Sequence, residues 1–206
     1  GGERFAVAQA GVPPGVEETE HALFMQLWAK MDLAHVFGFP LWDKAVFHLL
    51  HRSFSELQSI FAHYAKSGTA GSSSAHLAET MQQTELTNLA LDTGLATDAF
   101  PMARVQGVFA RADQTDEGKG GDHALELHEF MECVVQLAFG RANPRFGQVH
   151  HEHDAPNPLP DCLDRLGQQK LLQAAKRDRL APVKVDVEAE GEVKVLLKLR
   201  RAELKR

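Results

Sequence analysis

The most constraining feature of the sequence is a short pattern that occurs twice in its centre. An apolar residue is followed four positions later by a glutamate and then by a second apolar residue, in Met81–Leu86 and again in Leu125–Phe130. Each copy follows a polar loop, and each loop follows a stretch with apolar residues at helical spacing. The pattern therefore predicts two helix–loop–helix units that match each other.

Apolar residues recur at intervals of three and four along most of the chain, which predicts an all-α protein. The expected helices begin near Glu17, cover Leu41–His51, begin near Ser53, cover Thr84–Thr93, begin after Pro101, and cover Leu127–Phe139, Leu159–Arg179 and Glu192–Lys205. The segment Val183–Val187 alternates with a period of two, and a brief strand and a loop both remain open for it.

Changes in composition divide the chain into five parts. Residues 1–16 contain Gly, Ala and Pro without a period and predict an extended arm, and residues 17–52 predict N-terminal helices. Residues 53–140 contain the two matched units, and residues 141–158 predict a Pro-containing linker. Residues 159–206 predict C-terminal helices.

Composition also excludes several classes of protein. A net charge of −6 argues against a dedicated nucleic-acid binder, which needs a basic excess. No apolar run approaches the length that a membrane span requires. The two cysteines, Cys133 and Cys162, form no disulfide framework, so a reducing compartment, the cytoplasm, is expected.

The matched units resemble the EF-hand superfamily of calmodulin-like proteins over residues 54–139. In that family the apolar residue lies on a short two-stranded link between paired loops, and the glutamate that follows supplies two oxygens to calcium. The resemblance implies that Met81 and Leu125 lie opposite each other. It also implies that Glu85 and Glu129 each lie at the start of an exiting helix.

The second loop follows the family's motif further than the first. Asp113, Thr115, Glu117 and Glu129 fall where calcium ligands lie in the family. The stretch 113–129 nevertheless contains 17 residues, compared with 12 in a standard loop. Two interpretations remain: a single calcium site in this loop, or a degenerate loop that keeps its helices and binds no ion.

The first loop departs from the motif much more. Ala65 stands where the family has an aspartate, and the loop from Ala65 to Glu85 is rich in Ser, Thr and Gly. Hydroxyl groups do not supply the negative charge that holds a divalent cation. We therefore expect the first unit to be structural and to bind no metal.

A second candidate metal site is the histidine-rich run His150–Asp154. Three imidazoles and two carboxylates are ligands that zinc or copper accept. The run lacks helical spacing and lies between prolines, so a solvated linker is the competing interpretation.

The C-terminal stretch Glu192–Arg206 has a net charge of +4, from six basic and two acidic residues. A basic amphipathic helix of this kind is suited to docking on an acidic partner surface such as a tubulin tail. An ordinary exposed helix with basic residues near its C-terminus explains the same pattern.

The sequence contains no phosphate-binding loop, dinucleotide motif, zinc-protease motif or nucleophile elbow. We therefore predict a non-enzymatic structural or adaptor protein. Residues 61–147 resemble EF-hand proteins of flagellated protists, and this resemblance implies a cytoskeletal or ciliary protein of the flagellar axoneme, associated with microtubules. Tubulin and other axonemal proteins are the implied partners. The alternatives are a calcium sensor that uses the 113–129 loop and a metal-dependent protein that uses the histidine run.

Overall fold

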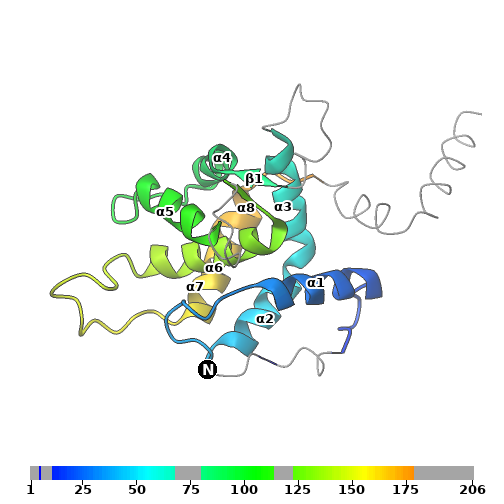
Figure 1. The fold of residues 1–206 in the computed structure, drawn as a ribbon, viewed down its shortest axis with the longest axis horizontal. Helices are drawn as coiled ribbons and strands as arrows, with labels where there is room; N and C mark the ends of the chain where they lie inside the picture. The colour runs from blue at the N-terminus through cyan, green and yellow to red at the C-terminus, as the bar shows by residue number, and fades with distance from the viewer. Residues whose placement is uncertain (1–4, 6–10, 68–79, 114–122, 179–206) are drawn as a thin grey trace, which may run out of the picture.

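The computed structural model describes residue 5 and residues 11–67, 80–113 and 123–178 (Figure 1). The helices are α1 (Glu18–Lys30), α2 (Asp43–Arg52), α3 (Phe54–Ser67), α4 (Gln83–Thr93), α5 (Met102–Ala112), α6 (Leu127–Ala142), α7 (Leu159–Leu166) and α8 (Leu172–Ala174), with a π-helical turn, η3 (Gly167–Leu171), before α8. The strands β1 (Met81–Gln82) and β2 (Ala124–Leu125) have two residues each. The prediction of a mostly helical fold is confirmed.

The two short strands join the matched segments of the chain. β1 and β2 pair antiparallel, with Met81 opposite Leu125, as the resemblance implies. Both side chains are fully buried. Below the strands, the ring of Phe61 on α3 packs against the ring of Phe130 on α6, with 5.5 Å between their centroids. The pairing and this aromatic contact therefore hold the entering helix of one unit against the exiting helix of the other.

Helix α6 is the central element of the fold. Every residue from His128 to Phe139 is buried, which is the behaviour of a helix that is covered on all sides. Helices α1, α3, α5 and α7 all pack against it. Its buried residues include Glu132, whose Oε1 atom accepts a hydrogen bond of 2.7 Å from the backbone N–H of Asp32, just after α1.

The N-terminal helices pack on each other and on α3 through a cluster of aromatic side chains. Phe24 and Trp28 of α1 contact Phe47 of α2, and Phe24 also contacts Phe54 at the start of α3. Their edge-to-face geometry is the arrangement that aromatic rings favour. Buried residues between positions 24 and 175 form one continuous core, so α1 and α2 belong to the same body as α3–α6.

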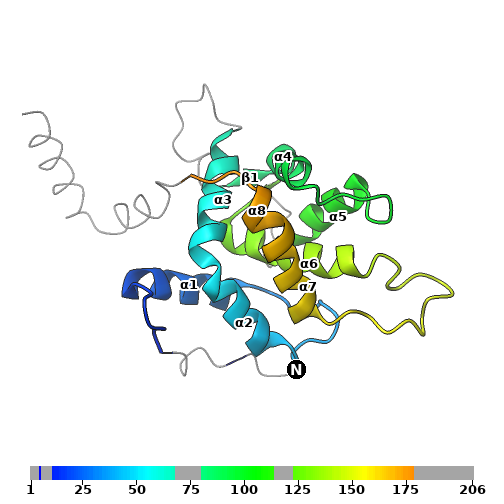
Figure 2. The same cartoon turned by 180° about the vertical axis from the view of Figure 1, so that it is seen from behind.

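Residues 159–178 pack on the same body, as Figure 2 shows from behind. Buried residues of α7 lie at positions i, i+3, i+4 and i+7, and they are Leu159, Cys162, Leu163 and Leu166. This stripe faces α6 and α2. Residues 141–158 thus connect two helices that contact each other.

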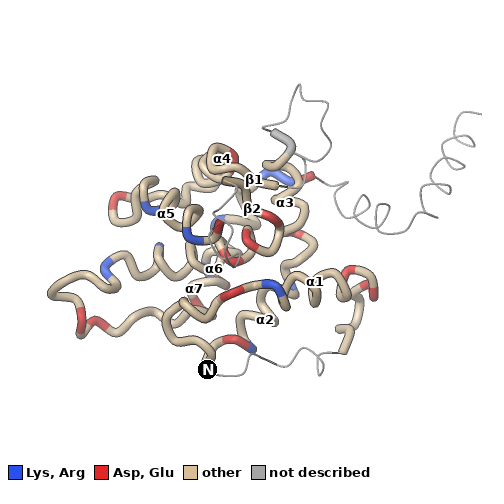
Figure 3. The backbone as a smooth tube through the Cα atoms, in the orientation of Figure 1, with Lys and Arg blue, Asp and Glu red and all other residues tan. Residues whose placement is uncertain are grey.

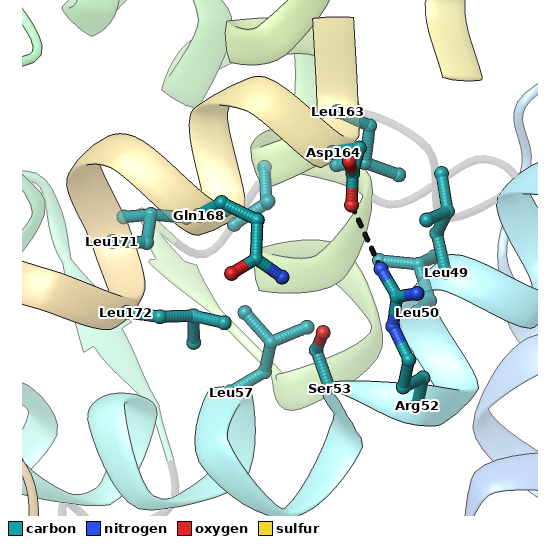
Figure 4. A pocket seen from close by; sticks show the side chains of 12 residues that line it. Leu49, Leu50, Arg52, Ser53, Leu57, Leu163, Asp164, Gln168, Leu171 and Leu172 are labelled. Carbon is teal, nitrogen blue, oxygen red and sulfur yellow. Dashed lines mark hydrogen bonds and ion pairs between the residues drawn. The ribbon is translucent and has the colours of Figure 1, made fainter. Parts of the chain in front are cut away.

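A small cavity of about 20 Å³ remains where α2, α3 and α6 meet α7 and η3 (Figure 4). This volume has room for about one water molecule. Its walls are mainly leucine side chains, and the ion pair between Arg52 and Asp164, at 2.7 Å, lies at its edge. Because both partners of the pair are about half exposed, we expect it to contribute little to stability.

The helix predicted for Leu159–Arg179 ends earlier than expected. Helix α8 stops at Ala174, and Ala175 is extended. The reason is long-range hydrogen bonding: the backbone N–H of Asp178 donates to the carbonyl oxygen of Ser59 on α3 at 2.9 Å, and the Ser59 hydroxyl donates to the carbonyl oxygen of Asp178 at 2.8 Å. The segments predicted at 183–187 and 192–205 lie outside the described residues.

A second set of contacts holds this extended segment at Lys176. Its backbone N–H donates to the Tyr64 hydroxyl at 3.2 Å, and its ammonium lies 2.9 Å from the Asp92 carboxylate. The Tyr64 hydroxyl in turn donates to Asp92 at 2.7 Å. Burial raises the pKa of Tyr64 from 10.0 to about 12, and the hydrogen bonds from Lys176 and Tyr64 lower the pKa of Asp92.

The variant Tyr64→Phe is expected to lose about 1 kcal/mol of unfolding free energy at neutral pH, because the Lys176 N–H loses its acceptor. Since the folded state raises the pKa of Tyr64, the stabilisation by this hydroxyl is complete below about pH 10 and is lost as the pH rises to about 12. Urea unfolding of both proteins at several pH values measures this. The free-energy difference between them should shrink across that window, and a constant difference would contradict the role of the hydroxyl.

None of the helices in the described part of the chain is long and apolar enough to span a membrane.

Candidate functional site

The glutamates that the family resemblance marks as calcium ligands lie at the starts of α4 and α6. The carboxylate of Glu85 accepts a hydrogen bond of 2.8 Å from the backbone N–H of Gln82, and the carboxylate of Glu129 accepts one of 2.7 Å from the backbone N–H of Glu126. Each glutamate therefore caps its helix, and both side chains are buried. The sequence pattern located both helix starts correctly because the cap is a local interaction.

Asp113 lies at the other end of the second loop, where α5 ends. Its backbone N–H donates to the carbonyl oxygen of Phe109 at 3.0 Å, and its side chain is buried. The exposed ring of His123 has its Nδ1 atom 3.9 Å from Oδ2 of Asp113. The other predicted ligands, Thr115 and Glu117, lie outside the described residues.

Metal binding by these residues stays a prediction. Within residues 11–67, 80–113 and 123–178 there is no group of three His, Cys, Asp or Glu side chains arranged to hold an ion. One oxygen of Glu129 already accepts the Glu126 N–H, so a calcium ion in the loop would compete with the helix cap for this carboxylate. Asp113 and Glu129 nevertheless lie at the two ends of one loop.

The histidine run His150–Asp154 lies in the irregular segment between α6 and α7. The ring of His151 is 2.8 Å from the Asp154 carboxylate, which closes a local turn. No third ligand joins them among the side chains that the structure describes.

Sequence reasoning missed a groove that four segments of the chain form together. The groove lies between α5, α6, the loop that follows α1 and the segment that follows α6, and has a volume of about 510 Å³. We call it the α5–α6 groove and define it by six of its lining residues: His35, Phe37, Arg104, Arg111, Phe139 and Phe146. The sequence feature that could have indicated this groove is the spacing of Arg104, Gly107 and Arg111, which places them on one face of α5.

Comparison with known proteins gave no match to a family model, a curated protein or a solved structure.

Proposed function

We propose that this protein is a non-enzymatic adaptor in which a degenerate pair of EF-hand-like units forms a rigid body that binds partner proteins. The proposal depends on what the structure shows of Glu85 and Glu129, the two glutamates that the family resemblance places at calcium-ligand positions. Glu85 and Glu129 are buried and each caps its own helix, while β1 and β2 join the two units. The residues that bind calcium in a sensor thus serve to stabilise the helices in this chain.

A second property supports a binding role. The same body exposes aromatic side chains beside arginines in the α5–α6 groove, where Phe37 is 52% and Phe146 is 44% exposed. Aromatic residues and arginine are the types that are enriched where proteins bind each other. We place this adaptor in a cytoskeletal or ciliary assembly, the axoneme of a flagellum, on the strength of the resemblance of residues 61–147 to flagellar EF-hand proteins.

The calcium sensor is the alternative, and it is favoured by the positions of Asp113 and Glu129 at the two ends of one loop. A sensor needs an ion that changes the angle between its helices. The adaptor proposal predicts that titration of the whole chain with calcium produces no heat at millimolar ion. It also predicts no change in the thermal unfolding midpoint.

The same calcium titration is then repeated with two variants, Asp113→Asn as the test and Asp98→Asn as its control. Asp98 lies in the turn before α5, and the same change there controls for the loss of one negative charge. A binding heat that Asp113→Asn abolishes and Asp98→Asn preserves would contradict the adaptor proposal and establish the sensor.

The cytoskeletal assignment has its own test, which is co-sedimentation with polymerised microtubules. We expect the whole chain to pellet with them. A chain that lacks Glu192–Arg206 should pellet more weakly, because this segment carries the +4 charge that would meet acidic tubulin tails. A chain that stays in the supernatant at low salt would contradict the assignment.

A further inference from the structure

We propose that the α5–α6 groove binds an acidic segment of a partner protein, with an apolar side chain on the phenylalanines and carboxylates on the arginines. This inference rests on the proposed adaptor function and names the chemistry of its partner. The groove's volume of about 510 Å³ falls in the range of sites that enclose small ligands or the anchoring side chains of a peptide.

The apolar part of the groove is a cluster of three rings. Phe37 lies 4.8 Å from Phe146 and 6.1 Å from Phe139, and Phe139 lies 5.0 Å from Phe146. Only Phe139 is buried; the other two rings leave about half of their surface in water. They come from the loop after α1 and the segment after α6, which together form one end of the groove. An apolar side chain placed there would remove this surface from water.

The polar part of the groove has basic side chains from two elements. Arg104 and Arg111 on α5 and His35 from the loop after α1 line it, and its lining includes no aspartate or glutamate from the described part of the chain. Figure 3 shows the basic positions of α5 in blue. A basic groove on a chain with a net charge of −6 is a local reversal of sign, and such reversals attract ligands of the opposite charge. The ligand should therefore be acidic.

The contacts of the two arginines leave most of their donors for a ligand. Arg104 donates to the carbonyl oxygen of Pro144, which orients its guanidinium at the edge of the groove. Within the residues that the structure describes, the hydrogen bond of Arg111 is a long one, 3.4 Å from its Nε to Oε1 of Gln136. Gln136 is 7% exposed, and its Nε2 atom has no hydrogen-bond partner among the described residues. The arginine end of the groove thus contains donors that lack acceptors.

A glycine in the middle of α5 keeps the groove open. A Cβ atom added at Gly107 would meet nothing closer than Nη1 of Arg111, at 3.8 Å, so packing does not require a glycine there. Gly140 on α6 is the contrasting case, because its added Cβ would lie 2.9 Å from the ring of Phe100. Glycine inside a helix costs about 1 kcal/mol relative to alanine. At Gly107 we attribute the acceptance of this cost in helix stability to the open binding surface that a glycine leaves.

The spacing of the arginines determines the expected form of the ligand. Seven residues of helix separate Arg104 from Arg111, which corresponds to about 10 Å along α5. An extended peptide covers that distance in about three residues. Because alternate side chains of an extended peptide share one face, the ligand that fits has two glutamates four positions apart and a leucine two positions beyond one of them.

The test is fluorescence anisotropy with the whole chain and a fluorescein-labelled peptide of this form. Controls are the same peptide with Gln for Glu, with Lys for Glu, and with Ser for Leu. We expect the acidic peptide to bind, and we expect the affinity of each control peptide to be lower by about tenfold or more. No binding of the acidic peptide, or equal binding of the lysine peptide, would overturn the proposal.

Variants locate the site. Gly107→Leu fills the groove and Arg111→Glu reverses its charge. Each change should lower the affinity for the peptide by about tenfold or more. Ala110→Leu, on the exposed side of the same helix, and Arg165→Glu, on α7, are matched controls that should bind as the unchanged chain does. Undiminished binding by Gly107→Leu, with circular dichroism confirming its fold, would overturn the proposal.

Other occupants would give distinct results. Sedimentation equilibrium that detects a dimer which Gly107→Leu dissociates would assign the groove to a second copy of the chain and overturn the proposal. Binding of decanoate without binding of the peptide would overturn it in favour of a free fatty acid. Peptide binding in the groove without pelleting with microtubules would support the peptide site and contradict only the cytoskeletal assignment. Pelleting without peptide binding would support the cytoskeletal assignment and contradict the peptide site.

Discussion

Replacing Phe130 with alanine is expected to remove about 3–5 kcal/mol from the free energy of unfolding. Phe130 lies on α6, has no exposed surface, and contacts Phe61 on α3 across the two helix–loop–helix units. Removal of the ring loses its burial and leaves a cavity that the surrounding helices fill only in part. Since domains of this size are stable by about 5–15 kcal/mol, this single change would remove a large share of the total.

Urea unfolding followed by circular dichroism measures the effect of Phe130→Ala. Leu91→Ala is the matched control, because Leu91 lies on α4 with 65% of its surface exposed and should change stability by less than about 0.5 kcal/mol. A loss below about 1 kcal/mol for Phe130→Ala would show that α3 and α6 do not pack as described.

The second large effect is expected at Glu132. This side chain has no exposed surface, and its Oε1 atom accepts the backbone N–H of Asp32 at 2.7 Å. Glu132→Ala would leave that N–H without its acceptor next to a new cavity. We expect a loss of about 3 kcal/mol. The contact joins α6 to the loop after α1, so this loss measures how firmly the N-terminal helices are held.

Glu132→Gln separates the hydrogen bond from the packing. The amide has the same shape and retains an oxygen for the Asp32 N–H, so its loss of unfolding free energy should be less than half that of Glu132→Ala. Equal losses for the two variants in urea unfolding would contradict the hydrogen-bond role and assign the stabilisation to the carboxylate charge instead.

Local interactions made much of this fold predictable from the sequence. The starts of α4 and α6 could be predicted because Glu85 and Glu129 cap helices three residues after Gln82 and Glu126, within the reach of a local pattern. The opposition of Met81 and Leu125 was expected from the family resemblance of the repeated pattern. The expectation that calcium binds Asp113, Thr115, Glu117 and Glu129 depended on family resemblance and remains a prediction.

Other features arise from residues that are far apart in the chain. The sequence placed Glu132 within an apolar run and offered no sign that its partner is 100 residues away. Likewise, helical spacing continued past Ala174, whereas the chain leaves the helix there because Lys176 and Asp178 bind α3. Periodicity reports which face of a helix is apolar and says nothing about which element covers it.

The sequence by itself determined which segments form most of the helices and that two units match, because periodicity and repeated patterns act over a few residues. That Glu85 and Glu129 cap helices was seen only in the structure. Only the tertiary structure decided that the flanking helices join the central units in one core and that the α5–α6 groove exists. The groove combines side chains from positions 35 to 146, and no local pattern contains the distances between them. Packing of the whole chain brings these side chains together.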